Sequence, residues 1–575
     1  MKKFNFIYFA SLLLAVLVLS SCGGLKKMKK NAHTVNYEVS PGVIEMHGDK
    51  IDIDVTARFP EKYFDKKATV VATPVLVFDG GEKALQSITI QGEKVEANNK
   101  VINFESGGKF NYKTSIPYTD DMRLSKLVFR LEATKKGKKL DFLPLKIADG
   151  VIATSSLLKS ENAKPISAKD NFKRIIPESF SADIHYLINS PLVRWSEMKS
   201  EDVNEFIEAI KAANEKENYK LRGLDISAYA SFDGEQDFNA ELSENRGKTA
   251  KEYMSGEMKK AEVEEAAKGT FYQEKSTAED WEGFKDLVGK SNIQDKDLIL
   301  RVLSRYSDPN VREQEIKNIA ETYKVLTDEI LPKLRRSVMT VNVDVIGKSD
   351  SEIANLSASN IKELNLEEQL YSATLTDDIN KKHDIYKNVT EQFDNCYRGF
   401  NNLGSTLVEM GKIDEAKMAF EKANQLYSKS TIVQNNLGAI ALIEGDYDKA
   451  EGYLRSASGA GKQVSNNLGI INIKKGDYQR AISGFGSDCD FNAALAKVLA
   501  GDNNGALKTL DCIEDQDAMV YYLRAVIGAR TKDSSMIMKN LEKACSMDSS
   551  LKAYATTDLE FGKYFEDNNF KSIVK

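Results

Sequence analysis

Hydrophobic and polar residues alternate along the first third of the chain, which is the pattern of strands that bury one face. The clearest run has Ile51, Ile53, Val55, Ala57 and Phe59 separated by polar residues. Similar runs follow at 69–78, 87–91, 101–104, 110–118, 126–133 and 142–147, with glycine-rich turns between them. Many short strands with regular turns are typical of two packed sheets. We therefore predict a β-sandwich over residues 33–155.

Helical and strand patterns are mixed after a polar stretch at about 160–173, for which we predict a linker. Apolar residues spaced three and four apart predict helices at about 201–210 and 242–258, and several more between 281 and 326. Alternating segments at 221–230 and 337–345 predict strands. Together these elements indicate an α+β domain over residues 176–350.

Part of this α+β region has a distinctive set of motifs, namely the turn Ala228-Tyr229-Ala230-Ser231-Phe232-Asp233-Gly234, then Asn239, Leu242-Ser243 and Arg246, and finally Arg335-Arg336 before a strand. These motifs together resemble the OmpA C-terminal domain. The resemblance implies an α+β fold that binds the diaminopimelate of peptidoglycan. In an ungapped match, the ligand-binding aspartate of the family falls on Ser231 and the arginine on Arg246.

The match departs from the family at Ser231. A carboxylate would bind the ligand's ammonium through a charge-assisted hydrogen bond worth about 1.5–3 kcal/mol, whereas a hydroxyl gives about 0.5–1.5 kcal/mol. Asp233 or Asp237 could substitute from a shifted position. The helices at 281–326 also make the segment between Arg246 and Arg335 about twice as long as in the family. Two readings stay open, a peptidoglycan site or a retained fold that serves as a scaffold.

The last third of the chain repeats itself. Asn-Asn-Leu-Gly occurs at 401–404, 435–438 and 466–469, with glycines 34 and 31 positions apart. Each glycine is followed after 12 positions by an alanine and after 16 by a large apolar residue. This pattern resembles the tetratricopeptide repeat, in which paired helices stack into a solenoid because a single pair cannot bury its apolar face. We predict an α-solenoid of such repeats over residues 360–575.

The resemblance implies a concave groove lined by the first helix of each repeat. In that geometry Asn401, Asn435 and Asn466 point into the groove, with Ser405 and Ile470 among their neighbours. An asparagine side chain both donates and accepts hydrogen bonds, so three in a row could hold the backbone of an extended partner peptide. The alternative is that these asparagines cap or join adjacent helices.

The N-terminus has the order of a bacterial export signal, with Lys2 and Lys3 before an apolar run from Phe6 to Leu19. Leu19-Ser20-Ser21-Cys22 resembles the lipobox of bacterial lipoproteins, which implies removal of residues 1–21 and acylation of Cys22. The alternative is an unmodified Cys22 after an ordinary signal. Residues 22–32, with four lysines, are predicted to be a flexible basic tether.

That tether bears on the location of the protein. Lipoproteins of the Bacteroidota that reach the cell exterior carry acidic residues after the cysteine, so a basic tether implies an outer-membrane lipoprotein that faces the periplasm. Alternatively, the lysines are a solvated leader that contacts anionic lipid headgroups. The formal charge of −6 becomes −8 once Lys2 and Lys3 are removed, which disfavours nucleic acid as a partner.

Few residues point to catalysis or to a cofactor. Cys396, Cys489, Cys512 and Cys545 lack the spacing of a metal or redox site; we expect buried apolar cysteines, although an exported chain could pair them. The four histidines are scattered, and no common catalytic motif is present. We expect no metal, no cofactor and no enzymatic activity.

The combined prediction is a periplasm-facing outer-membrane lipoprotein that serves as a scaffold or adaptor. It would bind a protein partner in its repeat groove, within an envelope assembly or secretion machine. A second hypothesis is a peptidoglycan tether that uses the OmpA-like region. A third is an assembly subunit whose sandwich stacks on copies of itself.

Overall fold

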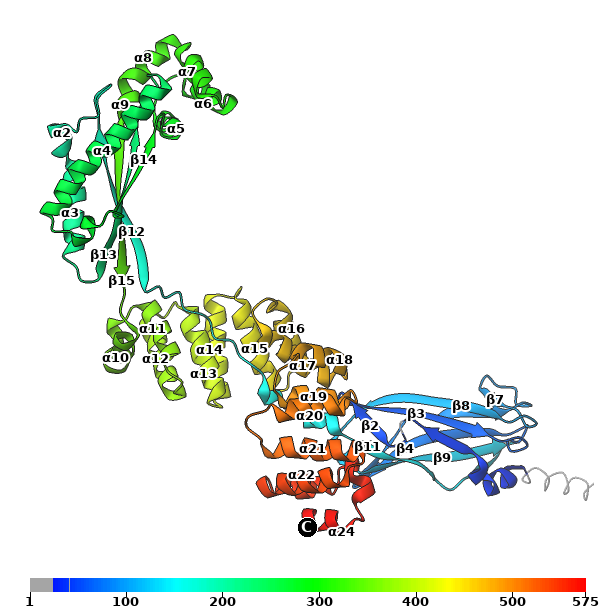
Figure 1. The fold of residues 1–575 in the computed structure, drawn as a ribbon. Coiled ribbons are helices and arrows are strands. Elements are labelled where there is room, and N and C mark those ends of the chain that lie inside the picture. Colours follow the sequence, from blue (N-terminus) through cyan, green and yellow to red (C-terminus); the bar gives the residue numbers. More distant parts are fainter. Residues whose placement is uncertain (1–23, 41) are drawn as a thin grey trace, which may run out of the picture. The chain divides into compact units, whose positions relative to one another are not determined.

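A computed structural model describes residues 24–40 and 42–575. The signal predicted at 1–21 and the acylation predicted at Cys22 lie outside the described residues. The chain forms two compact units, one containing residues up to 169 together with 378–575, and the other containing 170–377 (Figure 1). None of the helices in the described part combines the length and the apolar character that crossing a membrane requires.

The first unit begins with a β region of eleven strands. Their bounds are β1 Asn36–Val39, β2 Ile44–His47, β3 Lys50–Phe59, β4 Thr69–Phe78, β5 Gly81–Ala84, β6 Ile88–Gly92, β7 Lys100–Ile102, β8 Gly108–Pro117, β9 Ser125–Lys135, β10 Lys138–Asp141 and β11 Leu145–Ile152. β3 pairs with β1, β2 and β8, and β9 pairs with β4, β10 and β11. A short parallel pairing of β2 with β11 joins the two groups of strands.

The two groups of strands share one apolar core, which is the arrangement of a sandwich. Ile51, Ile53 and Val55 of β3 belong to the same buried cluster as Leu127 and Phe129 of β9. The alternation of β3 therefore fills this core, as its sequence predicts.

One end of the β region differs from the prediction. Residues 24–30 were expected to belong to a flexible tether, but they are helical. Leu25 and Met28 are each 2% exposed and pack against Phe64, Ile90 and Phe142. Residues 22–32 resemble a flexible tether because lysines dominate their composition. Leu25 and Met28, which are three positions apart, nevertheless lie on one face of a helical turn and hold it against the core.

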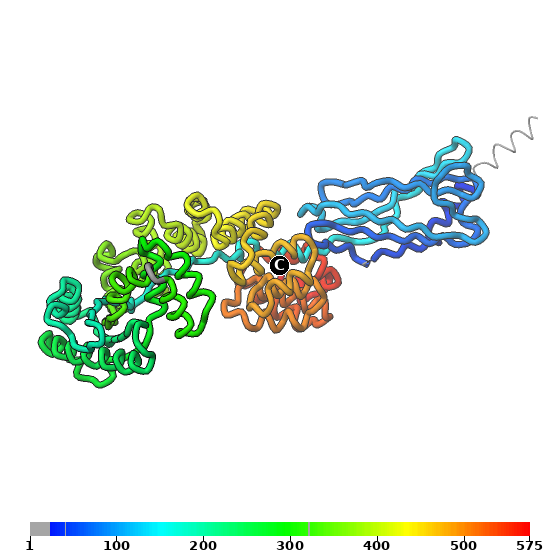
Figure 2. Tube along the Cα trace, turned by 90° about the horizontal axis from the view of Figure 1, so that it is seen from above, coloured from blue at the N-terminus to red at the C-terminus, as the bar shows by residue number. Residues whose placement is uncertain are grey.

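The same unit ends in a solenoid of helices. Their bounds are α12 Ile379–Gln392, α13 Tyr397–Glu409, α14 Ile413–Leu426, α15 Thr431–Ile443, α16 Tyr447–Ser456, α17 Lys462–Lys474, α18 Tyr478–Phe485, α19 Phe491–Leu499, α20 Asn503–Asp511, α21 Ala518–Thr531, α22 Ser534–Met547, α23 Ser550–Ala555 and α24 Asn568–Val574. Consecutive helices stack in pairs (Figure 2). The predicted start at residue 360 differs from the structure, in which the solenoid's unit resumes at residue 378.

The repeated glycine has a steric role in this stacking. A Cβ atom at Gly404 would lie 2.6 Å from the ring of Phe420, and one at Gly469 would lie 2.8 Å from the ring of Phe485. Only glycine lets the second helix of each pair approach so closely, which explains why a glycine and a large apolar residue recur 16 positions apart.

The second unit is built on a four-stranded sheet in the order β12-β15-β13-β14. The strands are β12 Ile175–His185, β13 Tyr219–Tyr229, β14 Tyr272–Thr277 and β15 Arg336–Ile346. α3 Glu201–Asn214 and α4 Gln236–Lys260 contribute to the core on the sheet, for example through Ile210 and Met254. Further helices are α2 Trp195–Met198, α10 Asp350–Ser359 and α11 Leu366–Ser372.

Five short helices lie between β14 and β15, in the segment where several helices are predicted between 281 and 326. They are α5 Trp281–Lys290, α6 Lys296–Arg305, α7 Pro309–Lys317, α8 Ala320–Glu329 and α9 Leu331–Leu334. They bury a cluster of their own, which also takes in Phe232 from the turn after β13. The ring of Phe232 stacks on Trp281 with 4.4 Å between the centroids.

Candidate functional site

Another part of the same chain lies along the first helices of the helical pairs. Residues 158–168, which we call the strap, follow the β region and run along α19, α17, α15 and α13 in that order. Figure 1 shows this segment in cyan beside the helices. The polar linker predicted at about 160–173 is therefore an ordered ligand of the repeats over most of its length.

Three asparagines hold the strap by its backbone. The amide N–H groups of Ala168, Ile166 and Lys164 each donate to an asparagine Oδ1 at 2.7 Å. The matching Nδ2 groups donate back to the carbonyl of the same strap residue at 2.8–3.0 Å. The asparagines are Asn402 for Ala168, Asn436 for Ile166 and Asn467 for Lys164.

A fourth repeat continues this pattern with a shift. Asn492 accepts from the N–H of Lys159 at 3.0 Å and donates to its carbonyl at 2.7 Å. A short 3-10 turn at Ser160–Asn162 separates this contact from the other three. The strap therefore runs antiparallel to the order of the repeats, and in each of these four repeats one asparagine bonds to both the N–H and the carbonyl of a single strap residue.

The three asparagines predicted to line the groove are the other members of each pair. Asn401 donates to the carbonyl of Ile166 and Asn435 to that of Lys164, both at 3.0 Å. Asn466 instead donates to Asp488 at 2.6 Å. All three are buried, at 0%, 0% and 3% exposure. An extended peptide does lie on the groove residues, and it belongs to this chain.

The two other predicted groove residues also face the strap region. The hydroxyl of Ser405 contacts the carbonyl of Ile166 at 3.4 Å. Ile470 is 2% exposed and belongs to the same apolar cluster as Ile166 and Ala163 of the strap. An outside partner would reach Asn401, Asn435 and Ser405 only after displacing the strap, because the strap backbone bonds to them.

The solenoid bonds to the backbone of alternate strap residues, which leaves room for a proline between them. Residues 164, 166 and 168 present N–H and C=O groups to the solenoid, as one edge of a β-strand does. Pro165 has no N–H to donate and falls between two of these positions. Recognition by amide groups is independent of most side chains, although the side chain of Ile166 is 9% exposed and belongs to an apolar cluster of the solenoid.

Ion pairs fix the strap lysines. Lys164 Nζ lies 3.2 Å from Asp488 and 3.8 Å from Asp490. The hydrogen bond from Asn466 and the charge of Lys164 lower the pKa of the Asp488 carboxyl. Lys159 Nζ lies 2.6 Å from Asp517. These contacts select basic residues at two positions of the strap.

A disulfide holds the loop that carries Asp488 and Asp490. Cys489 is bonded to Cys512 across 23 positions, while Cys396 and Cys545 are free. For this pair the alternative of a disulfide holds in place of the expected buried apolar cysteines, and the partners are too far apart in sequence for their spacing to reveal the bond. Burial raises the pKa of the Cys545 thiol.

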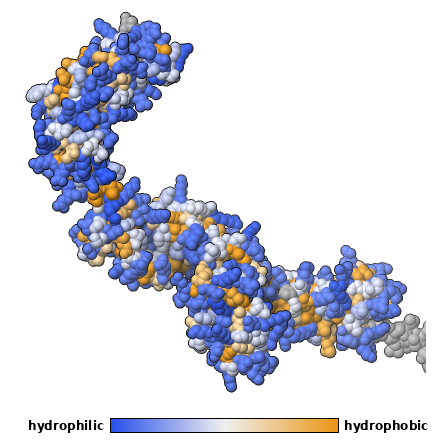
Figure 3. Space-filling model, viewed as in Figure 1, coloured by the Kyte–Doolittle hydropathy of each residue, from blue (hydrophilic) through white to orange (hydrophobic). Residues whose placement is uncertain are grey.

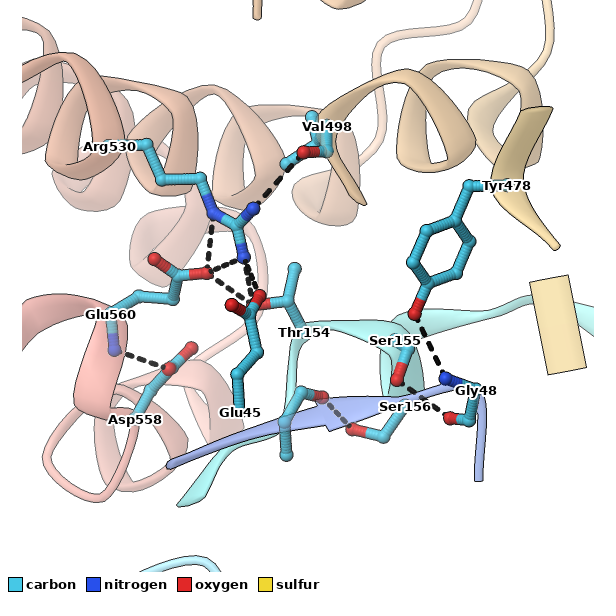
Figure 4. A network of polar contacts seen from close by, with 11 residues as sticks. Glu45, Gly48, Thr154, Ser155, Ser156, Tyr478, Val498, Arg530, Asp558 and Glu560 are labelled. Atoms are coloured by element: carbon cyan, nitrogen blue, oxygen red, sulfur yellow. Dashed lines mark hydrogen bonds and ion pairs between the residues drawn. The ribbon is translucent and has the colours of Figure 1, made fainter. Parts of the chain in front are cut away.

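A second polar network joins the β region to the last repeats (Figure 4). Arg530 of α21 contacts Glu45 at 2.7 Å and Glu560 at 2.5 Å. Burial opposes the charge of Arg530, but the carboxylates of Glu560 and Glu45 together outweigh burial and raise the pKa of the guanidinium. Tyr478 accepts from the N–H of Gly48 at 2.9 Å. The β region and the solenoid are therefore joined at β2 as well as through the strap.

The residues matched to the OmpA site lie together in the second unit. A pocket of about 370 Å³ is lined by Ser231, Asp233 and Arg246. Arg246 is 0% exposed and donates to the carbonyls of Leu187, Ser190 and Tyr229 at 2.9–3.1 Å. Burial lowers the pKa of Arg246 to about 10, so it stays charged at neutral pH.

Asp233 already has a cationic partner. Arg335 contacts Asp233 at 2.9 Å and the hydroxyl of Ser231 at 3.1 Å, and Ser231 also bonds to Asp233. The Asp233 carboxylate thus lies beside Ser231, the residue that matches the ligand-binding aspartate of the OmpA family. This proximity is required if Asp233 takes the role of that aspartate. Asp237 is exposed on α4 and is not among the residues that line the pocket.

Sequence reasoning missed the asparagines that make the paired contacts. Asn402, Asn436 and Asn467 directly follow the predicted residues, so the doubled asparagine was the available signal. Asn492 has no such neighbour and could not be found in this way. Among the side chains that the structure describes, no group of three or more histidine, cysteine or carboxylate residues is arranged to hold a metal ion.

Comparison with known proteins supports the repeats. The tetratricopeptide repeat family matches residues 397–430. No curated protein matches the chain. Among solved structures, the APC/C hetero-tetramer Cut9-Hcn1 is 14% identical, with 60% of this chain and 77% of that chain covered and a TM-score of 0.32.

Two bacterial structures are also similar. PilF of Pseudomonas aeruginosa is 15% identical over 37% of this chain and 96% of that chain, with a TM-score of 0.25. A tetratricopeptide repeat protein of Parabacteroides merdae is 14% identical over 48% and 98%, with a TM-score of 0.25. The family match shows a tetratricopeptide repeat at residues 397–430, and in the structure it lies within an array of stacked helical pairs.

Proposed function

We propose that this protein is a non-enzymatic scaffold of a bacterial envelope assembly or secretion machine, lipid-anchored in the outer membrane and facing the periplasm. Three observations support the proposal. The first 22 residues read as a lipoprotein signal ending in Cys22. The bond between Cys489 and Cys512 fits an oxidising compartment. Tetratricopeptide repeats act in protein–protein interaction, and no enzymatic family is indicated.

The asparagine contacts to the strap carry this proposal. Because the solenoid binds residues 158–168 of its own chain, the β region and the repeats form one platform on which other proteins can assemble. A partner segment that enters the groove must exchange with the strap. Such a segment would present backbone amides at alternate residues and a basic residue near Asp488, because those are the features that the strap uses.

Affinity purification from crosslinked membranes tests the scaffold proposal. We expect the wild-type protein to recover a stoichiometric envelope protein. Ile166→Pro weakens the strap but leaves every asparagine in place, whereas a triple Asn402/Asn436/Asn467→Ala variant removes the binding groups. If a partner exchanges with the strap, the first variant increases its recovery and the second abolishes it.

The other outcomes are also informative. Equal recovery with both variants would locate the partner on another surface of the platform and would exclude the groove. Asn395→Ala is the matched control, because Asn395 is an exposed asparagine of the same unit. Absence of any stoichiometric protein from the wild type and from Ile166→Pro would contradict the scaffold proposal.

Peptidoglycan tethering is the second candidate, and the pocket beside Arg246 favours it. The pocket combines a buried guanidinium with the Asp233 carboxylate, which are the two charges that a diaminopimelate zwitterion requires. Pull-down with purified sacculi should recover the wild-type protein and lose Asp233→Asn and Arg246→Lys. Asp237→Asn changes an exposed carboxylate on α4, the helix that carries Arg246, and this variant should bind as the wild type does. Sacculi that recover none of these proteins, or all of them equally, would remove this candidate.

A further inference from the structure

Lysines gather at the end of the β region that is remote from the solenoid contacts. We call this end the basic tip and define it by residues 24–30, 61–67, 93–96, 103–106 and 132–141. It contains seven carboxylates and twelve lysines, namely Lys26, Lys27, Lys29, Lys30, Lys62, Lys66, Lys67, Lys94, Lys135, Lys136, Lys138 and Lys139. The tip is therefore basic although the chain as a whole carries a net charge of −6.

Contacts between the segments bring these lysines together. The N–H of Lys94 donates to the carbonyl of Lys66 at 2.7 Å, and Lys29 Nζ donates to the carbonyl of Asp141 at 2.6 Å. Beneath them lies one apolar cluster that includes Leu25, Phe64 and Phe142. Figures 1 and 2 both show the helix at 24–30 at this end of the strands.

Most of the lysines have no carboxylate partner in the described part of the chain. Four carboxylates of the tip are paired, Asp65 with Lys135, Glu93 and Glu105 with Lys66, and Glu132 with Lys139. Nine exposed lysines then remain without an ion pair among the described residues, against three such carboxylates. Hydrophilic residues cover most of this end of the β region in the view of Figure 3.

One large apolar side chain stands out from this basic surface. Leu143 is 80% exposed, whereas its neighbour Phe142 is buried in the cluster beneath the tip. An exposed leucine beside several lysines is the combination that binds the interface of a bilayer, because the lysines contact headgroups while the leucine enters the acyl region.

We propose that the basic tip docks on the surface of a bilayer that contains anionic phospholipids. The lysines supply the attraction and Leu143 the apolar contact. The tip holds no arginine, so it lacks the planar, bidentate donors that favour nucleic acids and phosphopeptides. The docking does not require an acyl group, but it agrees with the anchor proposed at Cys22, two positions before the first described residue.

Docking through the basic tip would also set the distance between the repeats and the bilayer. β4 and β9 pair over ten residues, from Thr69 opposite Thr134 at the tip to Phe78 opposite Ser125 at the other end. At a rise of about 3.3 Å per residue, these strands hold the solenoid contacts about 30 Å from the lipid surface. The β region would thus act as a spacer between the membrane and the platform.

Vesicle sedimentation tests the proposal with an unacylated chain that starts at Gly24 and contains both compact units. We expect it to bind vesicles of mixed phosphatidylglycerol and phosphatidylcholine, to ignore pure phosphatidylcholine, and to dissociate as salt rises. A quadruple Lys67/Lys94/Lys136/Lys138→Gln variant should bind at least tenfold more weakly. Leu143→Ser should weaken binding severalfold at constant salt dependence.

A charge-matched control separates the tip from the net charge. Lys381, Lys412, Lys429 and Lys543 are exposed lysines of the solenoid, and changing all four to glutamine should leave vesicle binding unchanged. An equal loss in this control, or equal binding to pure phosphatidylcholine, would overturn the proposal. Tighter binding to single-stranded DNA or to an acidic peptide than to the vesicles would also overturn it. None of these results depends on whether the repeats recover a protein partner.

Discussion

Asn436 forms two hydrogen bonds with the backbone of Ile166, which lies 270 positions earlier in the chain. The N–H of Ile166 donates to Oδ1 at 2.7 Å, and Nδ2 donates to the carbonyl of Ile166 at 2.8 Å. One side-chain amide thus gives the strap the pair of bonds that a neighbouring β-strand would give. Because asparagines of three repeats form such bond pairs with alternate strap residues, the strap receives from the solenoid the hydrogen bonds that the edge of a β-sheet would provide.

Asn436→Ala should destabilise the first unit by about 2–4 kcal/mol. The substitution removes both bonds to Ile166 and leaves the buried N–H of that residue without an acceptor, which costs more than the bonds themselves contribute. Urea unfolding measures the change. Asn395→Ala should change the free energy of unfolding by less than about 0.5 kcal/mol, and an equal effect of both variants would contradict the structural role of Asn436.

Proline should be tolerated at one strap position and not at the next. Ile166→Pro removes the N–H that Asn436 accepts, so we expect the amides of residues 158–168 to lose their protection from hydrogen exchange. Pro165→Ala should leave that protection in place, at a cost of about 1 kcal/mol or less from the freer unfolded chain. Exchange followed by mass spectrometry distinguishes the two variants. Similar protection in both would show that the strap is not held through its alternate amides.

Arg530→Met should cost about 3–5 kcal/mol, because it leaves the buried Glu560 carboxylate without its cation. The side chain of Glu560 is only 5% exposed. Thermal unfolding measures the loss. Adding Glu560→Gln to Arg530→Met should restore part of the stability, since the second change removes the unpaired charge. A double variant as unstable as the single one would mean that packing, and not charge, explains the effect.

Asp558 should make the stability of the solenoid fall as pH rises. Burial, together with the charge of Glu560, raises the pKa of Asp558 to about 6. The folded protein therefore binds a proton more tightly than the unfolded chain, and this contribution is complete below the unfolded pKa and lost as pH rises through 6. Relative to the wild type, Asp558→Asn should gain about 1 kcal/mol between pH 5 and 7.5 in urea unfolding. A difference between the two proteins that is independent of pH would contradict this assignment.

Reduction of the bond between Cys489 and Cys512 should lower the stability of the solenoid by about 3 kcal/mol, the chain-entropy value for a loop of this size. The bond closes a loop of 23 positions, and Asp488 next to it contacts Lys164. We therefore expect hydrogen exchange to rise first at residues 159–164 when a reductant is added. Cys396→Ser, which changes a free cysteine, should show neither effect.

Regular patterns made much of the fold predictable from the sequence. The strand predicted at 69–78 has those bounds, because its alternating residues fill the sandwich core. The glycine and phenylalanine 16 positions apart predicted a close helical pair, and the ring of Phe420 does pack where Gly404 has no side chain. β12 was missed because residues 175–179 are exposed on both faces, so no alternation marks them.

The strap could not be predicted in the same way. Its residues are small, polar or charged, which is also the composition of a flexible linker, and the groups that bind it lie 234 to 333 positions away. The doubled asparagines indicated that a backbone would lie in the groove, but side-chain amides bind any extended backbone. Nothing in their pattern could identify the occupant as part of the same chain.

The strap also sets an order in which the protein can be completed. Residues 158–168 leave the ribosome long before Asn402, Asn436 and Asn467, and the whole second unit, residues 170–377, is made in between. The first unit is therefore discontinuous, and the strap has no binding site until the repeats that carry these asparagines have been made. A chain terminated before Asn402 would leave the strap without any of these three contacts and open to proteases.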